Sequence, residues 1–288
     1  MKPSAELIAT NRKDSMRRLG SIVNYGLISL ACLVFLVPFL WMIATALKPD
    51  QEVMHVPLSW IGSSLEWDNY LRAWRAFPFG RFIFNDLFVS ILGTLLTLVT
   101  SSMAAYAFSR LRFAGRDKIF IVYLATLMIP QQVIVIPMFL LMKYLGWVNT
   151  YQALIVPWAF TAFGTFLLRQ FFMQIPFEFD EAARIEGSSH FAIYLRVVVP
   201  LAKPGFATLG VFTFISYWNN FLWPLIITNN MSLYTLPLGL QMFQGQYGTA
   251  WNLLMAAATI SVVPALLLYL FAQRYIVLGV TFSGLGGR

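Results

Sequence analysis

Long apolar stretches without charged residues dominate the pattern of this chain. A helix needs about 20 apolar residues to cross the ~30 Å hydrocarbon core of a bilayer. Six stretches meet or approach that length without an Asp, Glu, Lys, Arg or His. They cover residues 25–47, 87–108, 119–142, 151–168, 206–227 and 253–272. The pattern therefore predicts an all-α integral membrane protein with a bundle of six transmembrane helices.

Composition agrees with this pattern. Hydrophobic residues make up 59% of the 288 residues and charged residues 11%, whereas a soluble domain has about 45–50% and roughly 25%. The chain has too few charges to cover the surface of a soluble globule of its size, which excludes an ordinary cytosolic enzyme. Cys32 is the single cysteine, so no disulfide can form within the chain.

The basic residues are distributed unevenly around the six stretches, and the net charge is +8. Fifteen of the 20 Lys and Arg residues lie in the N-terminal segment, the second and fourth connections and the tail, and five lie in the other connections. Basic loops stay on the cytoplasmic side. The sequence therefore predicts a cytoplasmic segment 1–24, a transmembrane domain 25–272 and a cytoplasmic tail 273–288. Dispersal of the charge over four segments argues against nucleic-acid binding.

Several kinds of chemistry are absent from the sequence. None of the six lysines follows a glycine, so the chain has no phosphate-binding Gly-Lys-Ser/Thr loop. His55 and His190 are predicted on opposite sides of the membrane, which leaves no zinc site. The six stretches contain no ionisable residue apart from tyrosines and Cys32, which disfavours an ion-coupled carrier without excluding it. Asp86 precedes the second stretch, where a helix N-terminus at the outer surface would favour an acid.

The most informative connection is 174–205, QIPFEFDEAARIEGSSHFAIYLRVVVPLAKPG. Pro176 suits the first turn of a helix, and Gly187 suits its end because glycine adopts a left-handed conformation readily. Ser188 can cap a following helix. The result is a short helix on a tight elbow. From the residues alone, this helix either lies in the lipid headgroups or docks a cytoplasmic partner.

The spacing within this connection resembles the EAA loop of ABC importer permeases. Glu181-Ala182-Ala183 is followed after three residues by Gly187, and nine further residues precede VVVP at 197–200. That family has Ile-x-Leu-Pro where this chain has VVVP. The resemblance implies that Glu181, Ala182, Ala183, Gly187 and Pro200 couple the chain to a separate ATPase through a cytoplasmic coupling helix. Gly187 is then expected to be the pivot.

Other segments resemble the carbohydrate-importer branch, whose members are maltose-type permeases with six spans. These segments are 129–133 (IPQQV), 166–178 (FLLRQFFMQIPFE), 218–224 (WNNFLWP) and 243–247 (FQGQY). The resemblance implies a type I ABC importer permease that forms half of the pathway for a sugar. Glycerol phosphate or another polyol derivative is the alternative solute. The tail, GLGGR, departs from the family's usual Gly-Ala-Val-Lys-Gly.

The resemblance also implies partners and a location. These are a second permease chain, a dimer of ATP-binding subunits that use the ATP, an extracytoplasmic solute-binding protein and the lipid of a bacterial cytoplasmic (inner) membrane. No catalytic residue, cofactor or metal is expected in this chain itself, and both termini are expected inside.

Amide side chains inside the apolar stretches are the candidates for the solute pathway. Buried amides are costly in a membrane unless they are paired or wet. Pro130 and Pro137 are expected to break the third helix, and the tryptophans of the WNNFLWP segment could stack on a sugar. Bonding between helices and ordinary packing are the alternative roles. The candidates are Gln131, Gln132, Trp218, Asn219 and Asn220.

Overall fold

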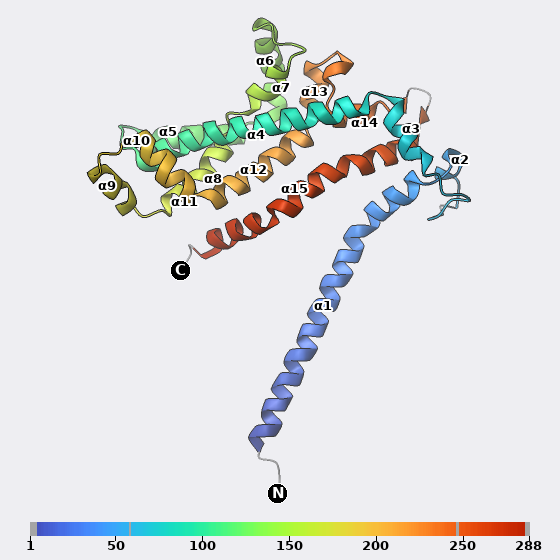
Figure 1. The fold of residues 1–288 in the computed structure, drawn as a ribbon, viewed down its shortest axis with the longest axis horizontal. Helices are drawn as coiled ribbons and strands as arrows, with labels where there is room; N and C mark the ends of the chain where they lie inside the picture. Colours follow the sequence, from blue (N-terminus) through green and yellow to red (C-terminus); the bar gives the residue numbers. More distant parts are fainter. Residues whose placement is uncertain (1–4, 58, 246–247, 286–288) are drawn as a thin grey trace. The chain divides into compact units, whose positions relative to one another are not determined.

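The computed structural model describes residues 5–57, 59–245 and 248–285 (Figure 1). The chain divides into two compact units, which are described separately. The first unit comprises residues 1–72 and 250–259, and the second comprises residues 73–249 and 260–288.

Helices make up most of the described chain, and the two short strands pair as an antiparallel hairpin. The elements are α1 (Ala5–Ala46), α2 (Asp50–Val53), α3 (Asp68–Ala76), α4 (Phe79–Arg110), α5 (Arg116–Ala125), η1 (Thr126–Met128), α6 (Gln131–Tyr144), α7 (Tyr151–Ile155), η2 (Val156–Trp158), α8 (Ala162–Met173), α9 (Glu178–Ile185), α10 (His190–Ile193), the π-helix η3 (Tyr194–Val198), α11 (Val199–Leu201), α12 (Lys203–Trp218), α13 (Leu222–Ile227), η4 (Met231–Leu233), α14 (Leu236–Gln241), β1 (Gln244–Gly245), β2 (Gly248–Thr249) and α15 (Trp251–Leu285).

Three described helices are long and apolar enough to cross a membrane by themselves: Val23–Ala46, Phe79–Arg110 and Trp251–Phe271. Three further helix pairs pass the same test together but are bent at a short break. These pairs are Arg116–Met128 with Gln131–Tyr144 (99°), Tyr151–Trp158 with Ala162–Met173 (49°) and His190–Leu201 with Lys203–Trp218 (79°). If each bent pair is one span, the described chain has six.

Proline explains one of the breaks. Pro130 immediately precedes α6, and Ile129 before it is extended, because a proline disfavours helical geometry in the preceding residue. The prediction that Pro137 also breaks the helix is wrong, because α6 runs through it. A proline removes one backbone donor, and the rest of the hydrogen-bond ladder can hold a membrane helix together.

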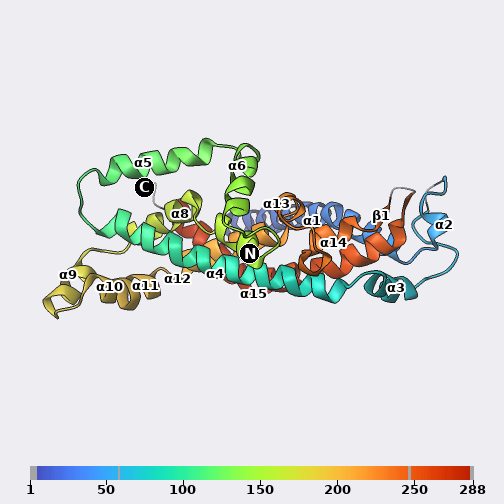
Figure 2. The same cartoon turned by 90° about the horizontal axis from the view of Figure 1, so that it is seen from above.

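The packing of the second unit centres on α4, which contacts both α8 and α12 (Figures 1 and 2). Glycines allow these helices to approach closely. A Cβ atom on Gly93 of α4 would lie 2.4 Å from Cζ of Tyr217 in α12, and one on Gly164 of α8 would lie 2.5 Å from Oγ of Ser101 in α4. Small residues at such contacts are typical of helix pairs in membranes.

Asp86 lies inside α4 rather than at its N-terminus. The helix begins at Phe79, so the prediction that Asp86 stands at an outer helix end is wrong. The side chain is 0% exposed, and neither carboxylate oxygen has a hydrogen-bond partner in the described part of the chain. The sequence pattern missed the first two turns because Arg81 and Asp86 interrupt the charge-free stretch.

The segment after α1 is ordered by polar contacts within the first unit. Lys48 is 1% exposed; its Nζ donates to the backbone oxygen of Ser59 and lies 4.6 Å from the centre of the Trp41 ring. The Ser63 hydroxyl and backbone N–H donate to the Glu52 carboxylate, and these hydrogen bonds lower the pKa of Glu52. These contacts therefore hold the connection in a defined conformation.

Candidate functional site

A pocket of about 910 Å³ lies within the second unit. Its wall combines amide, hydroxyl, aromatic and aliphatic side chains from α4, α6, α8 and α12 and from the breaks between helices. The lining residues are Thr97, Thr126, Leu127, Ile129, Gln131, Gln132, Ile134, Met138, Pro157, Trp158, Phe160, Thr161, Ala162, Phe163, Phe212, Thr213, Ser216, Tyr217, Asn219, Asn220, Phe221 and Leu222.

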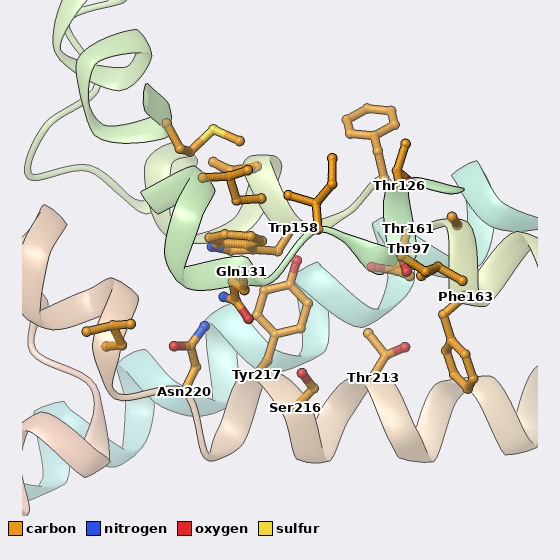
Figure 3. A pocket seen from close by; sticks show the side chains of 18 of the residues that line it. Thr97, Thr126, Gln131, Trp158, Thr161, Phe163, Thr213, Ser216, Tyr217 and Asn220 are labelled. Carbon is orange, nitrogen blue, oxygen red and sulfur yellow. The ribbon is translucent and has the colours of Figure 1, made fainter. Parts of the chain in front are cut away.

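All four amide residues that the sequence singled out line this pocket. Gln131 and Gln132 begin α6 directly after the 99° bend, and Asn219 and Asn220 directly follow α12. Figure 3 shows Gln131 and Asn220 close to the ring of Tyr217. The amides thus lie at two helix breaks that line one cavity, although about 90 residues of sequence separate them.

The tryptophans are arranged differently from the prediction. Trp218 does not line the pocket; it is 4% exposed and its ring stacks on Phe214. Trp223 is also buried, and its Nε1 donates to the backbone oxygen of Ala153 at 2.7 Å. Trp158 lines the pocket instead, and its Nε1 has no partner in the described chain. The indole ring that a ligand in the pocket could contact is therefore that of Trp158, whose Nε1 is itself buried.

Sequence reasoning missed the hydroxyl residues of the wall, because Ser and Thr are common in membrane helices. Thr213, Ser216 and Asn220 follow one another at spacings of three and four residues, which places them on one side of α12 and its end. That spacing could have identified this side. The side chain of Tyr217 is held in place at the pocket wall because its hydroxyl donates to the backbone oxygen of Ile155 at 2.8 Å.

The predicted short helix of the fourth connection is α9. Gly187 follows its end with φ +82°, as expected for a left-handed elbow. The N–H groups of Gly187 and Ser188 donate to the backbone oxygens of Arg184 and Ala183, both at 2.9 Å, which closes a Schellman motif. The prediction that Ser188 caps the next helix is therefore wrong. Ser189 is the cap, and its side chain accepts from the backbone N–H of Ala192.

The remaining residues of this connection differ in exposure. Glu181 and Ala182 are exposed on α9, whereas Ala183 is half-buried. Pro176 precedes the helix by two residues instead of lying in its first turn. Pro200 is exposed on α11, beyond the π-helix η3. Glu181 and Ala182 in the middle of α9 and Gly187 just beyond its end are thus all exposed.

These features define a class of protein. A bundle of apolar helices, a polar pocket at helix breaks and an exposed helix on an elbow are expected of a membrane transport component. The described residues include no group of three or more His, Cys, Asp or Glu side chains that could hold a metal ion.

The family model for the binding-protein-dependent transport system inner membrane component matches residues 97–281. The arabinooligosaccharides permease protein AraQ of Halalkalibacterium halodurans is 33% identical, over 94% of this chain and 99% of its own length. The trehalose/maltose permease protein MalG of Thermococcus litoralis is 36% identical, over 96% and 100%. The sn-glycerol-3-phosphate permease protein UgpE of Yersinia enterocolitica is 33% identical, over 93% and 98%.

A solved structure agrees with these relatives. A chain of a bacterial ABC transporter involved in import of the acidic polysaccharide alginate matches with a TM-score of 0.79 and 24% identity, over 90% of this chain and 97% of that one. This chain therefore belongs to the family of inner membrane components of binding-protein-dependent transport systems. It is a permease subunit with the type I ABC importer fold, a transport component rather than an enzyme.

Proposed function

We propose that this chain forms one half of the translocation pathway of an ATP-driven importer for an uncharged sugar delivered by an external binding protein. The observation that carries this proposal is the chemistry of the pocket. Gln131, Gln132, Asn219 and Asn220 line it together with hydroxyl and aromatic side chains, and none of the described residues in its wall is charged. Family membership supports the class of transporter, and the pocket supports the class of solute.

Amides and aromatic rings together suit a sugar. An amide offers a carbonyl acceptor and two N–H donors, so it can bond to neighbouring hydroxyl groups of one ring. Trp158 and Phe163 add apolar faces against which the C–H groups of a sugar can pack. A small number of polar groups in a mostly apolar wall is the usual way to orient a small ligand.

Glycerol phosphate or another polyol derivative is the second candidate, because one relative is named as a permease for sn-glycerol-3-phosphate. The pocket argues against it. Within the part of the chain that the structure describes, its lining includes no Lys, Arg or His. Burying a phosphate without a cation costs far more free energy than burying a hydroxyl group. The neutral solute is therefore favoured on the evidence of this half of the pathway.

The energy is proposed to come from a separate dimer of ATP-binding subunits. The chain has no Gly-Lys-Ser/Thr loop, while α9 exposes Glu181 and Ala182 on the predicted cytoplasmic side. Gly187 would let α9 move as a lever, with different contacts in each of two states. A second, different permease chain would complete the pathway. The uneven distribution of basic residues supports this orientation, with both termini inside.

Reconstitution tests this function. Proteoliposomes that hold this chain, the second permease and the ATPase are expected to accumulate a labelled neutral disaccharide only when ATP and the loaded binding protein are both present. An excess of sn-glycerol 3-phosphate is expected not to compete. Uptake by the isolated chain without ATP would contradict the proposal, and so would competition by the phosphate ester.

Substitution of one pocket amide should weaken solute handling without stopping ATP hydrolysis. We expect Gln132→Ala to raise the apparent KM for uptake about five- to tenfold, since one or two hydrogen bonds of about 0.5–1.5 kcal/mol each are lost. Gln152→Ala is the matched control, because Gln152 is exposed on α7 and does not line the pocket. Equal KM values for the two variants would remove Gln132 from the pathway.

A further inference from the structure

Arg110 joins three helices at one end of the second unit. It is the last residue of α4 and is 3% exposed. Its Nη1 donates to Oδ2 of Asp180 in α9 at 2.8 Å. Its Nη2 donates to the backbone oxygens of Phe172, in the last turn of α8, and of Ile175 just beyond that helix, the latter at 2.6 Å. One guanidinium therefore holds α4, α8 and α9 together.

The chemistry of this contact makes it rigid. The side chains of Arg110 and Asp180 are 1% and 2% exposed, so little water competes for their bonds. The Phe172 carbonyl oxygen, which also accepts from the N–H of Ile175 at 3.2 Å, lies at the C-terminal end of α8, where the backbone carries partial negative charge. A guanidinium presents its donors in fixed directions. The first turn of α9 therefore cannot shift against α4 and α8 without breaking one of these bonds.

The coupling helix itself has few other attachments. Asp180 is the one residue of α9 that is buried. Ala183, one turn later, packs against the apolar cluster that contains Phe172 and Tyr194. The Phe177 ring, 4.6 Å from the guanidinium of Arg110, lies beside the same contact. A force applied to the exposed side of α9 can therefore reach α4 and α8 through the contact between Asp180 and Arg110.

The helices at the other side of this contact form the pocket. Thr97 belongs to α4, and Ala162 and Phe163 belong to α8, and all three line the cavity. On the basis of the proposed function, we infer that Arg110 and Asp180 are positioning residues that transmit the movement of α9 to the solute pathway. The role goes beyond docking of α9 to an ATPase, because it concerns how docking reaches α4 and α8.

The test uses the complete reconstituted importer with two variants of the pair. Asp180→Asn keeps the shape of the side chain and removes its charge. Arg110→Lys keeps the charge and removes the planar fork, so one ammonium group must replace donors that point in different directions. Solute uptake and ATP hydrolysis are measured in the same vesicles and divided by the amount of assembled complex. Both variants are expected to continue hydrolysis while the ATP used per solute rises about fivefold or more.

Tyr194→Phe is the matched control. Its hydroxyl lies 2.7 Å from Oγ of Ser102, so the substitution removes a buried polar contact between the same connection and the same helix α4. The ratio of ATP to solute is expected to stay at the wild-type value. The inference is overturned if uptake and hydrolysis fall in proportion in the pair variants, if Tyr194→Phe raises the ratio equally, or if neither pair variant assembles at all.

A second readout separates this inference from the proposed substrate. The factor by which the loaded binding protein stimulates ATP hydrolysis does not require that the solute be a sugar. In both pair variants this factor is expected to fall toward one. A wild-type complex that responds to its binding protein but imports no sugar would contradict the proposed function, and the stimulation factor would then decide on Arg110 and Asp180. An unchanged factor in both variants overturns the inference.

Discussion

At the scale of single residues, the backbone of Gly187 determines how α9 ends. Its φ of +82° lies in the left-handed region, and apart from its chain neighbours no heavy atom of the described residues lies within 4 Å of the position that a Cβ would take. A side chain there would meet open space, so any penalty comes from the backbone. For residues other than glycine and asparagine this conformation costs about 1–2 kcal/mol.

A comparison of two substitutions isolates this effect. We expect Gly187→Val to leave membrane insertion intact but to displace α9, so that ATP hydrolysis continues and solute uptake falls. Gly187→Asn is the control, because asparagine tolerates the left-handed region. Uptake and hydrolysis in vesicles measure the outcome. Normal uptake with valine at this position would refute the pivot role.

Asp86 leads to a second prediction at this scale. A carboxylate that is 0% exposed and has no hydrogen-bond partner among the described residues is an unfavourable group to bury. We expect Asp86→Asn to leave uptake unchanged. The free energy of unfolding in detergent is expected to stay equal or to rise by up to about 2 kcal/mol. Loss of uptake in a stable, assembled Asp86→Asn complex would instead show that transport needs the carboxyl group.

The residues of the site differ in how visible they were in the sequence. Gln132 and Asn220 stood out because an amide inside an apolar stretch is unusual. Arg110 did not, because a basic residue next to a membrane stretch is ordinary, and its role depends on Asp180, 70 positions away. Trp158 and Trp218 lie in similar apolar surroundings, so only the packed fold shows which one faces the pocket.

At the scale of helices, α4 contributes both to the pocket and to the contact between Arg110 and Asp180. Its position depends on close approach to α8 and α12, and Gly93 and Gly210 lie at the α4–α12 contact with different amounts of room. A Cβ on Gly93 would lie 2.4 Å from the Tyr217 ring, whereas one on Gly210 would be no closer than 3.8 Å to Leu98. The first glycine is therefore required by space and the second is not.

This difference gives a matched pair of substitutions. Gly93→Ala is expected to lower the free energy of unfolding by about 1–3 kcal/mol, because the added methyl group must move α12 or Tyr217. Gly210→Ala is expected to be neutral or slightly stabilising, since alanine favours the helix and meets ordinary contacts. Thermal unfolding of the purified complexes measures both. Equal midpoints would mean that the α4–α12 contact adapts freely.

Helix positions were predicted better than helix breaks. Long charge-free stretches locate a helix because the bilayer sets its length. Residues 119–142 were one charge-free stretch with two predicted breaks, and the structure has one of them, a 99° bend at Pro130. Pro130 and Pro137 look alike in the sequence, yet only Pro130 marks the bend. Whether a proline bends a helix depends on its neighbours in space, and that information is not local.

At the scale of the whole molecule, charge asymmetry predicts which connections lie on each side of the membrane. The connection that contains α9 carries four basic residues, and the one that contains the β1–β2 hairpin carries none. We expect a reporter fused at Glu181 to report a cytoplasmic position and a reporter fused at Gln244 to report an external position. The reverse result would invert the topology and would detach α9 from a cytoplasmic ATPase.

The shallow seating of α9 has a consequence for how such transporters can diversify. Of its eight residues, only Asp180 is buried, so the identity of most of its surface is not constrained by packing within this chain. Under the proposed function, substitutions on that surface would pair the subunit with a different nucleotide-hydrolysing companion while the route through the bilayer stays as it is. Selection for a new companion and selection for a new cargo would then act on separate sets of positions.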